Sequence, residues 1–331
     1  HPIDAIFETV SGFTTTGASI LSDVEALSHC MLIWRSFTHW IGGMGVLVFI
    51  LCLLPLTGGY HMNLMKAESP GPSVSKLVPK VQSTAKILYT IYIILTIVEI
   101  IFLLIGKMPL FDTLCLSFGT AGTGGFGVKN DSIASYSTYN QVVITVFMIL
   151  FGINFNAYYL LLTKKVMQAA KNEEVRYYLG IIGLAIVAIA INTREMFTSF
   201  GSAFQQAAFQ VGSIITTTGY ATTDFNVWPV FSKTILVILM FVGACAGSTG
   251  GGIKVSRLLI LCKSARKELQ LYLHPNAVKK IKMDDKAIPH EVVRATNMFL
   301  FVYIMIFVIS LLIISLDNLD MVSNFTAIAA T

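Results

Sequence analysis

Long apolar stretches separated by short polar segments are the feature that most restricts how this chain can fold. A helix that crosses a bilayer takes about 20 residues. Six stretches approach or exceed that length, at residues 37–56, 87–106, 141–163, 177–191, 231–262 (interrupted) and 297–316. Only 12% of the residues are charged, against about 25% in soluble domains. The sequence therefore predicts an all-α membrane protein, with a short fourth span.

The positive charges predict which face of the membrane each polar segment occupies. Residues 57–86, 164–176 and 254–296 hold 4, 4 and 10 of the 23 Lys and Arg residues. Cytoplasmic segments carry such an excess, so we expect all three in the cytosol. Topology then accounts for the net charge of +5 without any binding of nucleic acid. Ten of the 18 acidic residues fall on the opposite face, where they would attract cations.

Three Gly/Thr turns recur at the same place in the hydrophobic pattern. We call them the first turn (residues 13–19), the second turn (120–126) and the third turn (215–221). Each follows a short apolar segment and precedes a long one. Glycine lets the backbone adopt positive φ and direct its carbonyls to one side. Carbonyls that replace a hydration shell are how a pore selects a dehydrated cation, so the turns indicate an ion pathway.

The recurrence predicts tandem units, each a helix, a half-length segment with its pore loop, and a second helix. Gly17, Gly124 and Gly219 align the first three units, and the last apolar helix and half-length segment begin a fourth. We expect four units around one pore in the parent protein, of which the first and last are incomplete here. The predicted division is 1–56 (pore loop and second helix of unit 1), 57–86 (cytosolic linker), 87–163 (unit 2), 164–176 (cytosolic linker), 177–262 (unit 3, second helix broken), 263–296 (basic cytosolic segment) and 297–331 (first helix and start of the pore helix of unit 4). We expect the chain to be a fragment that lacks both ends.

Half-length segments are expected at residues 2–12, 109–119, 198–212 and 319–331. A helix of about 11 residues is roughly 16 Å long, so it enters the membrane without crossing it. Each leads into a turn by its C-terminal end, where the negative end of the helix dipole favours a cation. Asp4 and Asp112 lie early in two of these segments, where a negative charge is favoured by the positive N-terminal end of the helix dipole.

Five glycines within residues 243–252 interrupt the fifth apolar stretch. We call residues 243–254 the glycine-rich loop. Each glycine costs a helix about 1 kcal/mol relative to alanine, so a break at membrane depth is expected. The alternative is an ordinary helix end followed by a cytosolic turn. Lys254 either anchors the loop or extends to the inner membrane surface.

Four motifs together resemble the Trk/Ktr/HKT superfamily of potassium transporters, and most of all its bacterial Trk-type pore-forming subunit. They are GFTTTGA (12–18), WRSFTHWIGGMG (34–45), TGGF (123–126) and ACAGSTGGGIK (244–254). The resemblance covers essentially the whole chain. It implies multi-pass insertion in the bacterial plasma membrane, transport rather than catalysis, K⁺ as the transported ion, and no organic cofactor.

The resemblance also implies which residues act on the ion. The implied K⁺ filter comprises Thr15, Thr16, Gly17, Gly122, Thr123, Gly124, Thr217, Thr218 and Gly219. The implied intramembrane gate comprises Gly243, Gly247, Ser248, Thr249, Gly250, Gly251, Gly252 and Lys254. In related plant transporters a serine at the first filter glycine accompanies sodium transport, so Gly17 favours potassium.

The implied partners are a second copy of the chain and a cytosolic nucleotide-binding regulatory subunit. The basic residues 263–294 are a candidate docking surface for that subunit, and anionic lipid headgroups explain their charge equally well.

Other candidate sites are weaker. Glu99, inside a predicted span, is either an ion or proton site or, as we prefer, a residue that holds helices together. Arg35 and His39 are expected near the outer interface. Residues 122–127 spell GTGGFG but lack the preceding strand and the later acidic residue of a dinucleotide site. The five scattered cysteines suggest neither a metal site nor disulfides.

Two rival functions stay open at this stage. One is a sodium-permeable member of the same superfamily. The other is a non-transporting membrane enzyme or scaffold whose glycines serve helix packing alone. Packing glycines would recur every four residues on one helix face, whereas these lie in Thr-rich turns between segments.

Overall fold

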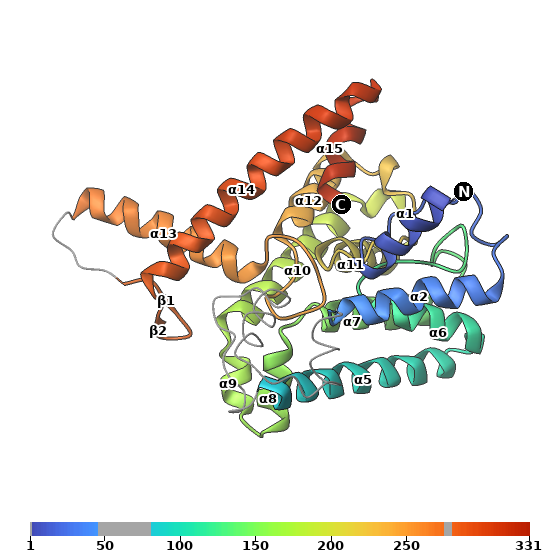
Figure 1. Cartoon of the computed structure of the whole chain (residues 1–331), viewed down its shortest axis with the longest axis horizontal. Helices are drawn as coiled ribbons and strands as arrows, with labels where there is room; N and C mark the ends of the chain where they lie inside the picture. Colours follow the sequence, from blue (N-terminus) through green and yellow to red (C-terminus); the bar gives the residue numbers. More distant parts are fainter. Residues whose placement is uncertain (1, 46–80, 275–279) are drawn as a thin grey trace.

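The structure, a computed structural model, describes residues 2–45, 81–274 and 280–331 and is almost entirely helical (Figure 1). The longer helices are α2 (His29–Gly43), α5 (Val81–Ile105), α7 (Thr138–Phe151), α10 (Glu173–Asn192), α11 (Phe200–Ile215), α12 (Val230–Val242), α13 (Val255–Leu273) and α14 (His290–Ile314). The shorter ones are α1 (Pro2–Phe13), α6 (Leu110–Ala121), α8 (Phe155–Leu162), α9 (Val166–Ala170), α15 (Met321–Ala330) and the 3-10 turns η1 (Arg194–Met196), η2 (Phe225–Val227) and η3 (Ser315–Asp317). Within these ranges the strands are β1 (Lys282–Met283) and β2 (Lys286–Ala287), an antiparallel pair. The predicted all-α class is confirmed.

Polar caps and prolines determine where many of the apolar helices begin. The side chains of Ser28, Ser137 and Asn172 accept hydrogen bonds from backbone N–H groups in the first turns of α2, α7 and α10. Such caps satisfy donors that a helix leaves unpaired at its start. Proline directly precedes α6, α12 and α14. Each helix therefore starts where a local sequence signal permits it.

Within the part of the chain that the structure describes, three helices are long and apolar enough to cross a membrane: residues 85–105, α10 and residues 290–317. A fourth span is possible if α7 and α8 are counted together, but these two helices meet at 91°. The prediction of one spanning helix over residues 141–163 is therefore wrong. The chain bends at residues 152–154, which we call the elbow, where Gly152 ends α7 and the Asn154 side chain caps α8.

The remaining predicted spans differ in detail. The fourth span is longer than expected, because the Asn172 cap starts α10 at Glu173 and gives it 20 residues. The fifth is interrupted as predicted, since α12 ends at Val242 and α13 begins at Val255. Helix α13 then runs to Leu273, so part of the predicted cytosolic segment 263–296 is helical. In the region of the first predicted span, α2 ends at Gly43. Residues 46–56 of that span and residues 57–80 of the linker lie outside the described residues.

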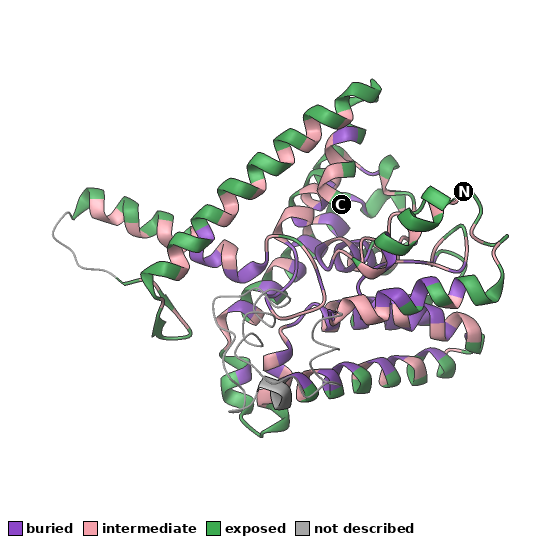
Figure 2. Cartoon of the chain, viewed as in Figure 1, coloured by how far each residue is buried: buried purple, intermediate pink, exposed green. Residues whose placement is uncertain are grey.

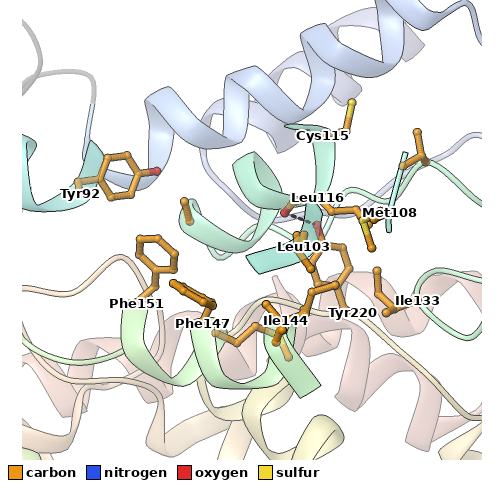
Figure 3. Close-up of a cluster of buried hydrophobic side chains, with 14 of the residues drawn as sticks. Tyr92, Leu103, Met108, Cys115, Leu116, Ile133, Ile144, Phe147, Phe151 and Tyr220 are labelled. Atoms are coloured by element: carbon orange, nitrogen blue, oxygen red, sulfur yellow. Dashed lines mark hydrogen bonds between the residues drawn. The ribbon is translucent and has the colours of Figure 1, made fainter. Parts of the chain in front are cut away.

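Buried apolar side chains form two clusters. One joins α2, α5, α6 and α7 and is shown in Figure 3. The other joins α10, α11, α12 and the glycine-rich loop. The first turns of α13 join the second cluster through Val255 and Leu259. The rest of α13 and α14 project outward and are largely exposed (Figure 2), and none of the apolar window of α14 is buried. The two clusters thus include α6 and α11, the helices that lead into the second and third turns.

Candidate functional site

Each Gly/Thr turn begins at the C-terminal end of a helix, α1, α6 or α11. In every turn the backbone has positive φ at two positions, separated by one residue. The pairs are Thr15 (55°) and Gly17 (74°), Thr123 (50°) and Gly125 (78°), and Thr217 (60°) and Gly219 (85°). Positive φ is uncommon for residues other than glycine, so the shared pattern indicates one local structure used three times.

Backbone hydrogen bonds align the turns in the same way. In each, the residue between the two positive-φ positions donates its N–H to the carbonyl five residues earlier. These bonds are Thr16 to Ser11 (3.0 Å), Gly124 to Gly119 (3.0 Å) and Thr218 to Ser213 (2.9 Å). The sequence alignment of the second turn was wrong by one residue, because adjacent glycines look equivalent in sequence. Gly125, not Gly124, matches Gly17 and Gly219, and Gly122 precedes the repeated three-residue structure.

The structure brings the three turns into contact with one another. A Cβ atom added to Gly17 would collide with the carbonyl oxygen of Gly124. One added to Gly125 would collide with the carbonyl oxygen of Thr218. One added to Gly219 would meet no described atom within 4 Å. The first and second turns, and the second and third, therefore lie backbone against backbone, and only glycine fits where they touch.

Serine hydroxyls fasten the first and third turns to their own helices. Ser11 Oγ donates to the carbonyl of Ala18, and Ser213 Oγ donates to the carbonyl of Tyr220, both at 2.6 Å. Each bond joins a helix residue to the residue directly after the turn glycine. These serines were not singled out from the sequence, although each lies four residues before the first positive-φ threonine of its turn.

The second turn is fastened differently, by a side chain from the third turn. Gly119 occupies the position of the two serines, and its missing Cβ leaves room for the Tyr220 hydroxyl. Tyr220 Oη lies 3.3 Å from the carbonyl oxygen of Phe126 and 3.2 Å from that of Leu116. Figure 3 shows Tyr220 reaching Leu116 within the buried cluster. One tyrosine thus connects the second and third turns.

Arg35 and His39 pack directly behind the turns. Arg35 Nε donates to Glu8 Oε2 at 2.9 Å, and its guanidinium lies 4.0 Å from the ring centre of Phe126. His39 is fully buried and stacks on the same ring at 4.0 Å. A Cβ on Gly124 would collide with the imidazole. The expectation that these two residues simply line an outer interface was therefore incomplete: they support the first and second turns.

Glu99 also lies behind the second turn. Its side chain is fully buried and faces the Thr120 hydroxyl near the C-terminal end of α6. It therefore faces protein rather than lipid. Among the described residues no group of three His, Cys, Asp or Glu side chains could hold a metal ion.

The loops on the acidic face are joined by Asn130. Its amide donates to Asp23 Oδ1 at 2.8 Å and accepts from the Val24 N–H at 2.8 Å, while its own backbone N–H donates to Glu25 Oε1 at 3.0 Å. The hydrogen bond from the Asn130 side chain lowers the pKa of Asp23. Asp23 therefore keeps its negative charge near the first and second turns at physiological pH.

The glycine-rich loop lies between the third turn and the elbow. The Gly251 N–H donates to Thr217 Oγ1 at 2.7 Å. On the other side, the Cys245 N–H donates to the Gly152 carbonyl at 3.0 Å, and the Phe155 N–H donates to the Gly247 carbonyl at 2.9 Å. The loop therefore contacts a positive-φ threonine of the third turn directly.

Lys254 lies at the end of this loop with φ of 78°. Its Nζ donates to the Gly250 carbonyl, and the residue is buried. Of the two alternatives for Lys254, these contacts favour the anchor, because the ammonium bonds within the loop and is buried.

Comparison with known proteins identifies one family and several relatives that match nearly the whole chain. The family described as TrkH, cation transport protein, matches residues 1–331. The Trk system potassium uptake protein TrkH of Salmonella typhimurium is 35% identical over 333 residues, which cover 99% of this chain and 69% of the relative. TrkH of Vibrio parahaemolyticus is 38% identical over 336 residues, with the same coverage.

A solved structure also matches. The crystal structure of the potassium transporter TrkH from Vibrio parahaemolyticus superposes with a TM-score of 0.87 at 34% identity. The match covers 99% of this chain and 68% of that one.

Proposed function

The chain belongs to the TrkH family of cation transport proteins, and on this premise we propose that it takes up K⁺ across the bacterial plasma membrane. The observation that carries the proposal is the backbone contact between the three turns. The turns that follow three separate helices contact one another through their backbones. Glycines that served helix packing alone would not need to bring such turns together. The relatives are themselves named potassium uptake proteins.

In this proposal, dehydrated K⁺ binds main-chain carbonyl oxygens of the turns. The residues are those predicted from the sequence with Gly125 added in place of Gly122: Thr15, Thr16, Gly17, Thr123, Gly124, Gly125, Thr217, Thr218 and Gly219. Helices α1, α6 and α11 each point their C-terminal ends at the turns, so their dipoles favour a cation. The proposal includes the predicted division into helix–pore-loop–helix units around one pore.

The membrane potential would drive uptake. An interior-negative potential contributes about 2.3 kcal/mol per charge per 100 mV. This is enough to accumulate K⁺ without any reaction at the chain itself, and the proposed role is accordingly transport rather than catalysis.

The glycine-rich loop is the proposed gate, through Gly243, Gly247–Thr249, Gly250–Gly252 and Lys254. Its hydrogen bond to Thr217 Oγ1 supports this assignment, because the loop lies next to the third turn. A gate must be displaced to open, and a segment with several glycines has a backbone that can rearrange.

The proposed partners are a second copy of the chain and a cytosolic nucleotide-binding subunit. The exposed projection of α13 and α14 offers a large surface for such contacts. The basic residues of α13 would face the cytosolic subunit.

Uptake of ⁸⁶Rb⁺, a K⁺ substitute, into proteoliposomes containing the full-length protein tests the proposal. We expect uptake that depends on an interior-negative potential and is competed by K⁺ far better than by Na⁺. Absence of Rb⁺ uptake with the protein inserted and its regulatory partner present would reject transport. Equal competition by Na⁺ would favour the sodium-permeable alternative.

A further inference from the structure

A buried carboxylate outside the predicted site connects the glycine-rich loop to the start of α13 and to the elbow. Glu174 is 3% exposed and lies in the first turn of α10. Its Oε1 accepts the backbone N–H of Ala246 at 2.6 Å and that of Ser256 at 3.1 Å. Its Oε2 accepts the side-chain amide of Asn154 at 3.3 Å. One side chain thus contacts the loop, the start of α13 and the elbow.

The chemistry of these contacts suits a carboxylate. All three partners are N–H donors, and a carboxylate is a pure acceptor when ionised. Ser256 lies in the first turn of α13, where backbone N–H groups have no partner within the helix. The carboxylate therefore lies at the N-terminal ends of both α10 and α13, where helix dipoles favour negative charge.

The two N–H donors on Oε1 lie on either side of Gly247 and Gly250–Gly252. Ala246 precedes Gly247, and Ser256 follows Lys254. Their shared acceptor holds the two ends of this segment together, while the Gly251 N–H bonds to Thr217. Displacing the loop from the third turn would therefore pull at least one donor away from Glu174, and movement of α13 would do the same through Ser256.

We propose that Glu174 is a positioning residue that holds the glycine-rich loop against the third turn and couples it to α13. This inference rests on the proposed function insofar as the loop is the gate. Force applied to α13 from the cytosolic side would separate Ser256 from the carboxylate and release the loop.

The test combines a structural and a transport readout in the full-length protein in proteoliposomes. Cys245 is fully buried within the loop, and its modification by a small thiol reagent, measured by peptide mass spectrometry, reports loop displacement. For Glu174→Ala we expect modification to accelerate by about tenfold or more, because a buried acceptor of several hydrogen bonds is lost. Rb⁺ influx without the regulatory partner should rise as well.

Two further variants keep the test decisive. Glu174→Gln preserves side-chain volume and should accelerate modification less than Glu174→Ala. Glu173→Gln changes the neighbouring carboxylate in the same helix turn, which pairs instead with Lys263 at 2.6 Å, and should leave Cys245 protected. If Cys245 stays protected in inserted Glu174→Ala and Glu174→Gln, or if Glu173→Gln exposes it equally, the inference is overturned. Exposure of Cys245 without any change in Rb⁺ influx would support the positioning role and count against the loop as the gate.

Discussion

At the scale of single residues, close backbone contact explains why certain glycines are required. Gly17 combines a φ of 74° with a neighbouring carbonyl oxygen that leaves no room for a Cβ. Gly119 has no unusual φ, but its missing side chain accommodates the Tyr220 hydroxyl. These two glycines therefore serve different purposes, and substitutions should separate them.

Replacing Gly17 by serine should weaken selectivity for K⁺ over Na⁺. A residue other than glycine in this conformation costs about 1–3 kcal/mol, and its side chain would displace the Gly124 carbonyl. We expect the K⁺/Na⁺ preference, measured by competition against Rb⁺ uptake, to fall by about tenfold. Gly180→Ser is a matched control, because a Cβ on Gly180 meets no described atom within 4 Å. An unchanged preference in Gly17→Ser would remove this residue from the filter.

Gly119→Ala and Tyr220→Phe should be strongly coupled. Alone, Gly119→Ala forces a methyl group against the tyrosine hydroxyl, and such overpacking costs about 1–3 kcal/mol. Tyr220→Phe alone loses hydrogen bonds worth about 1 kcal/mol. The double variant removes the colliding oxygen, so its thermal stability should exceed that of Gly119→Ala. Strictly additive losses of stability would show that the two residues do not share this space.

At the scale of elements, the elbow between α7 and α8 creates the place where the glycine-rich loop binds. The bend exposes the Phe151 and Gly152 carbonyls and the Phe155 N–H, which a continuous helix would pair internally. Thr249 Oγ1 lies 3.3 Å from the Phe151 carbonyl, and the other two groups bond to the loop backbone. Two interrupted helices thereby satisfy each other's unpaired backbone groups, as the interior of a membrane requires.

Gly152→Ala should damage this arrangement. Its added methyl group would collide with the Tyr178 hydroxyl and lie 3.0 Å from Thr216 Cγ2. We expect a loss of about 1–3 kcal/mol in stability, measured as a lower unfolding temperature in detergent. Gly183→Ala in α10, where a Cβ meets no described atom within 4 Å, should be neutral or slightly stabilising. Equal stability of the two variants would contradict the close packing at the elbow.

At the scale of the whole molecule, the distribution of charge predicts one orientation in the membrane. Two of the basic segments contain α9 and α13 and one reaches the start of α10, whereas the acidic loops joined by Asn130 lie near the first and second turns. Short loops rich in Lys and Arg remain in the cytosol. The protein should therefore expose the start of α2 outside and α13 inside.

Two native cysteines test this orientation. Cys30 at the start of α2 and Cys262 on α13 are both exposed. A membrane-impermeant thiol reagent applied to intact cells, with Cys52 replaced by serine, should modify Cys30 and spare Cys262 until the cells are opened. Cys115 and Cys245 are buried and serve as internal controls. Modification of Cys262 in intact cells would reverse the proposed topology.

The helical type of the chain and one of its two breaks were predictable from local signals. Apolar length indicated α5, α10 and α14, and the glycine run indicated the break between α12 and α13. The bend at residues 152–154 was missed because its neighbours are apolar and a single glycine is tolerated within a helix. Glu174 was missed for a similar reason, since an acidic residue in the first turn of a helix is ordinary.

Apolar length, charge asymmetry and the recurring Gly/Thr turns are properties of the chain read in order, and they were enough to establish an all-α membrane protein with candidate ion-binding turns. Which glycine of an adjacent pair contacts a neighbour, which tyrosine replaces a missing serine, and which carboxylate holds the glycine-rich loop depended on packing between segments up to about a hundred residues apart. Such contacts arise only when the helices are placed in three dimensions, because hydrogen bonds and collisions are set by distance in space rather than by separation along the chain.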